Sequence, residues 1–221
     1  MAIPLLEAIN IAGKTITGDA LLTQRRLADY LVAGRQAHYH FTVKGNQPSL
    51  RADLVLYFEG RNEPDAISVD SGHGRIDTRK IWTTSELNGY LDFPWVGQAF
   101  IIERESIVKK TGEVSTETAY GVTSCTSEEA NADKVLNTNR NHWCIENSCH
   151  YIIDWNFDED RSRIRTGYGP ENISRLRRFA VGLIKSKGVP SVAQKMRQLA
   201  MSVRSVLDYL RMTTNSSVPS S

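Results

Sequence analysis

Three side chains that can bind metals or move protons follow one another at helical spacing in the second half of the chain. Within the stretch from Asn139 to Arg165, His142, Glu146 and His150 stand four residues apart. On an α-helix this spacing places all three on one face. Apolar neighbours give the segment a second face to bury, and a carboxylate on a half-buried helix invites a chemical explanation.

The first interpretation of this face is a metal site. His142, Glu146 and His150, with Cys144 or Cys149 nearby, have the side-chain types of a zinc site and predict a zinc hydrolase. No other cluster in the sequence supplies the remaining ligands. The alternative is that the histidines belong to the core and that Glu146 works with a second carboxylate elsewhere.

Asp19 is that second carboxylate. The sequence predicts a strand over Lys14–Thr17 and a helix over Leu22–Val32, then a strand over His38–Lys44 and a helix over Ser49–Phe58. This alternation is typical of a βαβ unit with a parallel sheet. Ligands gather at the carboxyl ends of such strands, where Asp19 is expected to cap the following helix or to bind a metal ion.

The two carboxylates together suggest a particular chemistry. If the helix of Glu146 lies against the sheet edge that carries Asp19, the pair can share a divalent cation. Hard oxygen ligands select Mg²⁺ or Mn²⁺. Two such ions activate water and stabilise the leaving oxygen in phosphodiester cleavage.

The remaining elements set the expected architecture. From about residue 60 to residue 126 the pattern changes to antiparallel strands, so the fold class is α/β with a β-rich extension. Helices are expected at the start of the chain and again after this block, and residues 213–221 read as a flexible tail. The expected helices are Ile3–Ala12, one beginning at Glu128 and capped by Thr126 or Ser127, Glu171–Lys187 and Val192–Arg211.

Charge is unevenly distributed along the chain. Between Arg161 and Arg211 there are twelve Lys or Arg residues and two acids, whereas the rest of the chain has fifteen bases and twenty-three acids. This split indicates a polyanion-facing C-terminal third or, alternatively, solvated helix faces. Arg161, Arg163 and Arg165 could pair locally with the acids before them or grip phosphates.

Composition excludes other classes. The chain is 40% hydrophobic and 24% charged, which is typical of a soluble protein. No apolar run approaches the ~18 residues of a membrane span, and no signal peptide is evident. Three cysteines without a CxxC pair indicate a reducing cytosol, with the cysteines as buried apolar residues.

Several long blocks resemble a known family. They are TGDALLTQ (17–24), FTVKGNQPSL (41–50), HGRIDTRKIW (73–82) and NRNHWCIENSCHYIIDWNFDEDRSRIRTGYGPENISRLRR (139–178). In this order, over almost the whole chain, they resemble the C-terminal part of insertion-sequence DDE transposases of the H-repeat-associated type. The resemblance implies an RNase H-like mixed sheet flanked by helices, with a β-rich insertion (about 60–126) between the second and third catalytic carboxylates.

The resemblance also implies roles for particular residues. Asp19 matches the second aspartate of the DDE triad and Glu146 matches its glutamate, so both are expected to be catalytic ligands of Mg²⁺ or Mn²⁺. The implied reaction is strand cleavage and transfer during transposition, in the bacterial cytoplasm at the nucleoid. DNA is the implied partner, a homo-oligomer is expected, and the residues expected to contact DNA are Arg140, His142, Arg161, Arg163 and Arg165.

One family feature is missing. The family's first aspartate lies on an earlier strand, and none of the 18 residues before Asp19 is an aspartate. We therefore expect residues 1–212 to form a partial, N-terminally truncated catalytic domain that does not transpose by itself. The alternative to an enzyme is a non-catalytic DNA-binding remnant.

Overall fold

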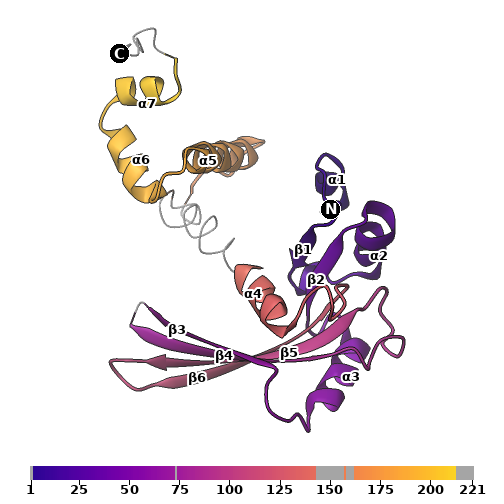
Figure 1. Ribbon diagram of the computed structural model, residues 1–221. Coiled ribbons are helices and arrows are strands. Elements are labelled where there is room, and N and C mark those ends of the chain that lie inside the picture. The colour runs from indigo at the N-terminus through magenta and orange to yellow at the C-terminus, as the bar shows by residue number, and fades with distance from the viewer. Residues whose placement is uncertain (1, 73, 143–156, 158–161, 213–221) are drawn as a thin grey trace, which may run out of the picture. The chain divides into compact units, whose positions relative to one another are not determined.

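The computed structural model describes residues 2–72, 74–142, 157 and 162–212, and it contains two compact units, Met1–His142 and Trp143–Ser221. The first unit is a mixed α/β structure in which helices flank a curled six-stranded sheet (Figure 1). The expectation of one catalytic domain over residues 1–212 remains a prediction. No helix in the described residues is long and apolar enough to cross a membrane.

The predicted βαβ unit is confirmed. Strands β1 (Thr15–Gly18) and β2 (His38–Val43) are parallel neighbours, with Thr15 opposite His38 and Gly18 opposite Phe41. The connection between them contains a 3-10 turn (Ala20–Leu22), helix α2 (Arg25–Asp29) and a π-turn (Tyr30–Gly34). Helix α3 (Pro48–Phe58) follows β2, as the sequence predicts.

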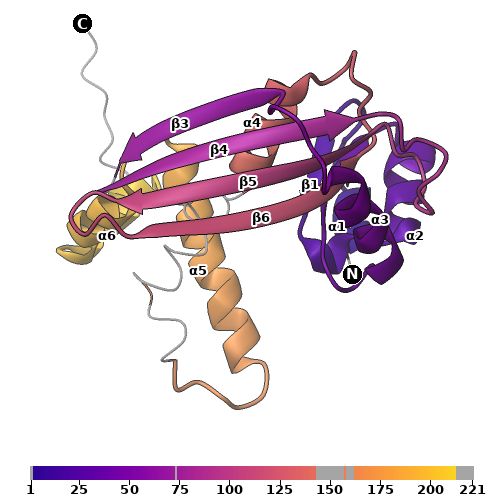
Figure 2. The same ribbon diagram turned by 90° about the horizontal axis from the view of Figure 1, so that it is seen from below.

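Four antiparallel strands extend the same sheet. The sheet order is β1-β2-β6-β5-β4-β3, and β2 pairs antiparallel with β6. Figure 2 shows the long strands side by side as a twisted ribbon. The β-rich block is therefore continuous with the parallel pair through the β2–β6 ladder. The four strands are β3 (Ala66–Gly72), β4 (Arg75–Thr84), β5 (Gln98–Val108) and β6 (Val114–Thr123).

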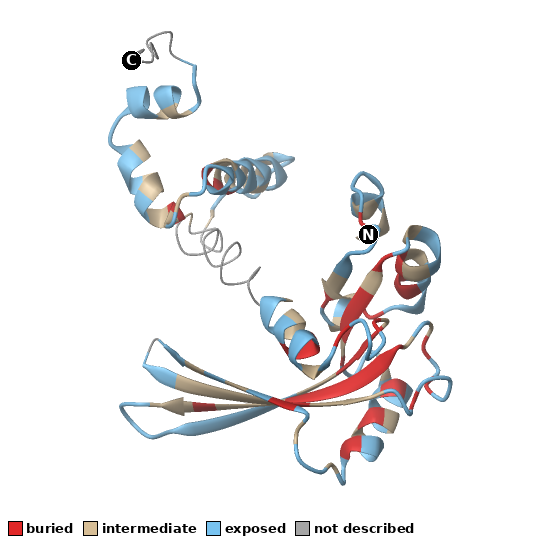
Figure 3. Cartoon of the chain, viewed as in Figure 1, coloured by how far each residue is buried: buried red, intermediate tan, exposed pale blue. Residues whose placement is uncertain are grey.

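Burial is concentrated at one end of these strands, where helices cover the sheet (Figure 3). One face of β2 and β5 carries Tyr39, Phe41 and Ile101, which pack in the same core cluster as residues of α2 and α3. The opposite face carries Phe100, which packs in a second cluster with Val135 of helix α4 (Ala132–His142). Period-two alternation along each strand accounts for these two cores.

Three predicted helices have wrong boundaries in the first unit. The helix expected over Leu22–Val32 begins at Arg25 and passes into the π-turn at Tyr30. The first helix, α1, spans Ala2–Glu7 and ends before Ala12. The Arg35 guanidinium donates to the carbonyl oxygens of Leu6 and Ile9, which satisfies the helix end and lets the chain turn so that Ile11 enters the core. The structure thus replaces the last part of the expected helix with a turn.

The helix expected from Glu128 begins later. Thr126 and Glu129 do bond reciprocally in the manner of a capping box, but they close only a turn. The helix itself starts at Ala132, where the side chain of Asn131 accepts a bond from the Lys134 backbone N–H. The predicted capping bonds therefore form, but the predicted start of the helix was wrong by about one turn.

The second unit contains the C-terminal helices. Helix α5 (Gly169–Ser186) matches its prediction closely. The single last helix expected over 192–211 is instead two helices, α6 (Val192–Ala200) and α7 (Val203–Tyr209), because the Ser202 side chain caps a new helix start. The predicted tail, residues 213–221, lies outside the described residues.

Candidate active site

Asp19 lies directly after the last residue of β1. Its carboxylate oxygen Oδ1 accepts a hydrogen bond of 3.2 Å from the Leu22 backbone N–H, so Asp19 caps the 3-10 turn that follows. The residue is exposed at the carboxyl end of the parallel strand pair. Asp19 is thus a capping residue, but of this short turn and not of the expected helix, because α2 begins only at Arg25 after Gln24. Metal binding by the same carboxylate remains a prediction, which the exposed position favours.

Hydrogen bonds from three side chains, one of them buried, hold the turn that carries Asp19. The Thr23 hydroxyl, fully buried, donates to the Thr42 carbonyl at 2.6 Å. The amide of Gln47 donates to the Thr23 carbonyl at 2.9 Å, and the amide of Asn46 donates to the Ala20 carbonyl. These residues come from two of the blocks that carry the family resemblance, which thus act together as the frame of the Asp19 turn.

Gly18 lets this turn sit close to the sheet. A Cβ atom at this position would lie 3.0 Å from the Phe41 ring and 3.0 Å from Leu22 Cβ. Both neighbours are packed against the first core cluster. A side chain here would push the Asp19 turn away from β2. The glycine therefore allows the turn, and with it the Asp19 carboxylate, to lie close to the sheet.

Helix α4 docks beside β1. The His142 Nδ1 atom lies 3.0 Å from the Thr17 hydroxyl oxygen, two residues before Asp19. One turn earlier, the Asn139 amide lies 3.4 Å from Nε2 of His40, whose ring stacks on Phe100 with centroids 4.6 Å apart. Burial, with a smaller contribution from the nearby His142, lowers the pKa of His40 to about 3. His40 is therefore neutral at pH 7.

The Arg140 side chain extends from α4 toward strand β3. Its guanidinium forms an ion pair of 2.9 Å with Asp70 of β3, and Asp70 also pairs with Arg79 at 2.8 Å. About half of the Arg140 side chain is exposed, so the DNA contact expected of it would compete with this pair. That contact remains a prediction.

Of the arginines expected at DNA, two lie in the described residues of the second unit. Arg163 and Arg165 are exposed and belong to a segment without helix or strand. Arg161, Glu146 and His150 lie outside the described residues. The structure therefore places Asp19, Arg140 and His142 in the first unit and leaves the position of Glu146 as a prediction.

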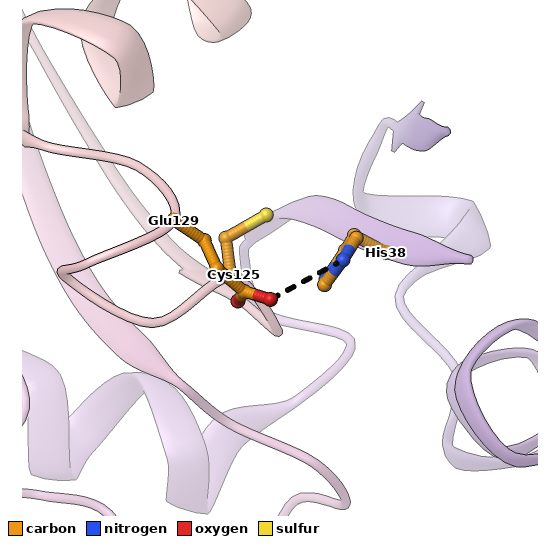
Figure 4. Close-up of side chains that lie close together, drawn as sticks. All are labelled: His38, Cys125 and Glu129. Atoms are coloured by element: carbon orange, nitrogen blue, oxygen red, sulfur yellow. Dashed lines mark ion pairs between the residues drawn. The ribbon is translucent and has the colours of Figure 1, made fainter. Parts of the chain in front are cut away.

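One group of metal-ligating side chains was missed in the sequence. His38, Cys125 and Glu129 come together from the start of β2, the end of β6 and the turn before α4 (Figure 4). The Nε2 atom of His38 lies 3.7 Å from Oε1 of Glu129. Hydrogen bonding from the Thr126 backbone N–H lowers the pKa of the Glu129 carboxyl. His38 and Cys125 are 87 residues apart, so no spacing motif could reveal the group.

Comparison with known proteins defines the class. The family described as "Transposase DDE domain" matches residues 1–172, so the chain belongs to the DDE transposase family. The resemblance noted in the sequence is thereby confirmed.

Three relatives illustrate the relationship. The chain is 31% identical over 215 residues to the H repeat-associated putative transposase YhhI of Escherichia coli K12, covering 90% of this chain and 56% of the relative. It is 30% identical over 214 residues to the putative protein YbfL of the same strain, with the same two coverages.

The putative transposase YncI of Escherichia coli O157:H7 is 29% identical over 212 residues, with 90% of this chain and 54% of that protein covered. The chain thus spans about half the length of the relatives it matches.

Proposed function

We propose that this chain forms part of the catalytic domain of a DNA transposase that cleaves and joins DNA strands at the ends of an insertion sequence. The observation that carries the proposal is the position of Asp19 in a hydrogen-bonded turn at the carboxyl end of β1. Helix α4 lies beside this strand, in contact with it through His142 and Thr17. Glu146 follows His142 by four residues, one helical turn if the helix continues. This spacing favours a shared site for the two carboxylates.

An RNase H-like fold is the arrangement we propose for this domain. The parallel β1–β2 pair next to an antiparallel β6 gives the mixed sheet that the assignment needs. Strands β3 to β5 extend this sheet, and we propose that they belong to the family's insertion between the second and third carboxylates. The family match over residues 1–172, which includes both carboxylates, supports the assignment.

The donor atoms fit a hard cation. Asp19 offers carboxylate oxygens on an exposed, hydrogen-bonded turn, which suits Mg²⁺ or Mn²⁺. When bound, the metal would supply activation of water and stabilisation of the leaving oxygen. Asp19 and Glu146 would hold the ion, while the cap to Leu22 fixes the orientation of the first carboxylate.

DNA is the proposed substrate. Arg163 and Arg165 are exposed in the second unit, and helix α5 adds Arg175, Arg177 and Arg178 nearby in sequence. Arginines of this kind neutralise phosphates and give salt-dependent affinity. We propose contacts to DNA from Arg140, His142 and Arg161 as well, assembly as a homo-oligomer, and action at the bacterial nucleoid.

Residues 1–221 supply two of the family's three carboxylates. We therefore propose that this polypeptide by itself binds the metal weakly and does not transpose. A non-catalytic DNA-binding role is the second candidate, favoured by the exposed Arg163 and Arg165. The family relationship favours both candidates over a zinc hydrolase built on His142, Glu146 and His150.

Iron-directed cleavage tests the shared carboxylate site. Fe²⁺ replaces Mg²⁺, and with ascorbate and peroxide it cuts the backbone near its ligands. We expect cuts near residues 19 and 146, both lost in Asp19→Asn and in Glu146→Gln. Asp133→Asn, which removes an exposed carboxylate from α4, is the matched control and should cut as the parent does. Cuts near residue 146 that survive Asp19→Asn but vanish in His150→Gln would favour the zinc site instead.

A plasmid assay separates the two candidate functions. With Mg²⁺ or Mn²⁺, we expect residues 1–221 to bind supercoiled DNA in a salt-dependent way and to leave it unnicked. Robust nicking that Asp19→Ala abolishes would contradict the proposed inactivity and support a complete catalytic site. Binding without metal-directed backbone cuts would favour the DNA-binding role.

A further inference from the structure

The side chains of His38, Cys125 and Glu129 converge on one point (Figure 4). The ring nitrogen, the sulfur and the carboxylate oxygen lie within 4.8 Å of one another, and the nitrogen and oxygen are 3.7 Å apart. Bonds of about 2.0–2.3 Å around a tetrahedral zinc separate its ligand atoms by roughly 3.5 Å. The imidazole and carboxylate thus already stand at ligand spacing, and the sulfur lies within 4.8 Å of both.

Neighbouring groups hold two of the three ligands in position. The Ser124 hydroxyl lies 3.4 Å from Nδ1 of His38, on the side of the ring opposite Nε2. This contact orients the ring so that Nε2 faces Cys125 and Glu129. Hydrogen-bond partners of metal-binding histidines orient the ring in the same way. The Thr126 backbone N–H donates to Oε2 of Glu129 at 2.8 Å, so that Oε1 faces His38.

The third ligand, Cys125, is buried, while the other two are partly open to solvent. Cys125 is buried, as expected of the cysteines from the sequence, and its sulfur lies 3.9 Å from the Thr15 hydroxyl oxygen. His38 and Glu129 are about 29% and 48% exposed, so an ion can reach the group from solvent. Three protein ligands leave one coordination position for water.

This group is separate from Asp19. In the parallel pair, Thr15 stands opposite His38 at one end, whereas Asp19 follows Gly18 at the other. Four residues of strand span about 13 Å. The ligand types also differ. A thiolate and an imidazole favour zinc-like ions, whereas a carboxylate such as that of Asp19 favours Mg²⁺.

We propose that His38, Cys125 and Glu129 bind a zinc-class transition-metal ion that fastens the chain between β6 and α4 to the start of β2. The ion joins two segments that are distant in the sequence, the start of β2 at His38 and the stretch that contains both Cys125 and Glu129. The second segment ends in the turn at Glu129, which leads directly into α4, whose far end carries His142. The site therefore sets where α4 begins relative to the sheet.

Cobalt spectroscopy tests the site directly. Cys144 and Cys149 are first replaced by serine, so that Cys125 is the only thiol. Titration of this protein with Co²⁺ should give thiolate-to-cobalt charge-transfer absorption in the near ultraviolet and intense tetrahedral d–d bands, saturating at one equivalent. Zn²⁺ should displace the cobalt, and Mg²⁺ should not.

Variants assign the ligands. In this background, Cys125→Ser should abolish the charge-transfer band, and His38→Gln and Glu129→Gln should each weaken Co²⁺ affinity at least tenfold. Glu128→Gln, the adjacent exposed carboxylate, is the matched control and should bind as the parent does. Asp19→Asn should also keep the band, so failure of the proposed catalytic site would leave this result unchanged.

Two outcomes would overturn the proposal. The first is the absence of a charge-transfer band in the background protein, and the second is equal loss of affinity in Glu128→Gln and Glu129→Gln. Cys125 is buried, so its variant is checked by circular dichroism. Because His38 and Glu129 are partly exposed, their variants report on binding even if Cys125→Ser unfolds.

Discussion

The Nδ1 atom of His142 lies 3.0 Å from the hydroxyl oxygen of Thr17, and this contact joins helix α4 to strand β1. The two residues are 125 positions apart in the sequence. Thr17 precedes Asp19 by two residues, and His142 precedes Glu146 by four. The contact therefore joins two elements of the first unit whose ends lie close in sequence to the two proposed metal ligands.

Removing this contact should loosen α4. Thr17→Val keeps the shape of the side chain but loses the hydroxyl, so we expect a loss of about 1 kcal/mol in the free energy of unfolding, measured by urea denaturation. Thr118→Val, at an exposed position of β6, is the control and should change stability by less than about 0.5 kcal/mol. Equal effects of the two substitutions would argue against a stabilising bond between α4 and β1.

His40 should make stability depend on pH. Its folded pKa is lowered from 6.5 to about 3, mainly by burial, so the unfolded chain binds more protons between these values. Stability therefore rises with pH across this window and is lost as pH falls below about 6.5. By pH 4.5 the loss from this residue should be of the order of 2 kcal/mol.

The measurement is urea denaturation at pH 7 and pH 4.5. His40→Gln removes the titrating group, so the variant should lose less stability between the two pH values than the parent does. His73→Gln, which also removes one histidine but not the one stacked on Phe100, is the control and should retain the parental decline. A decline of equal size in His40→Gln would contradict the role of His40.

Gly121 should tolerate no side chain. A Cβ atom there would lie 2.1 Å from the Phe100 ring and 2.7 Å from the Phe41 carbonyl oxygen. Phe100 is fully buried and stacked on His40, so it cannot move aside cheaply. We expect Gly121→Ala to lower the free energy of unfolding by at least about 2 kcal/mol.

Thermal unfolding provides the check on Gly121. Gly60→Ala is the matched control, because a Cβ atom at Gly60 would meet nothing within 4 Å. This variant should unfold within a few degrees of the parent. If both glycine variants unfolded together, the close approach of Phe100 to β6 would not be a constraint on the fold.

The exposed arginines of the second unit should contribute to DNA affinity through charge. Arg163→Gln and Arg165→Gln should each weaken binding and reduce the slope of log affinity against log salt by about one. Fluorescence anisotropy with a short duplex at several salt concentrations measures both quantities. Arg25→Gln is the control, because Arg25 already pairs with Asp92 at 2.8 Å in the first unit. A slope that Arg163→Gln leaves unchanged would argue against phosphate contact there.

Local pattern was enough to predict the elements around Asp19. Alternating strand and helix signals gave β1, β2 and α3 nearly at their observed bounds and placed a helix between the two strands, because period and turn residues act within a few positions. The same local signals gave wrong helix bounds where another local structure, a turn or a second helix cap, formed instead. The cap at Thr126 closed a turn, and Ser202 split a continuous apolar pattern into α6 and α7.

The sequence by itself determined the family, the βαβ order and the position of Asp19 after the first strand. Only the tertiary structure decided that β6 pairs with β2, opposing His40 to Thr123, and that His142 meets Thr17. It also brought His38, Cys125 and Glu129 together. Periodicity specifies which face of an element is buried but not which distant element covers it. That choice depends on chain closure and on packing over the whole sheet.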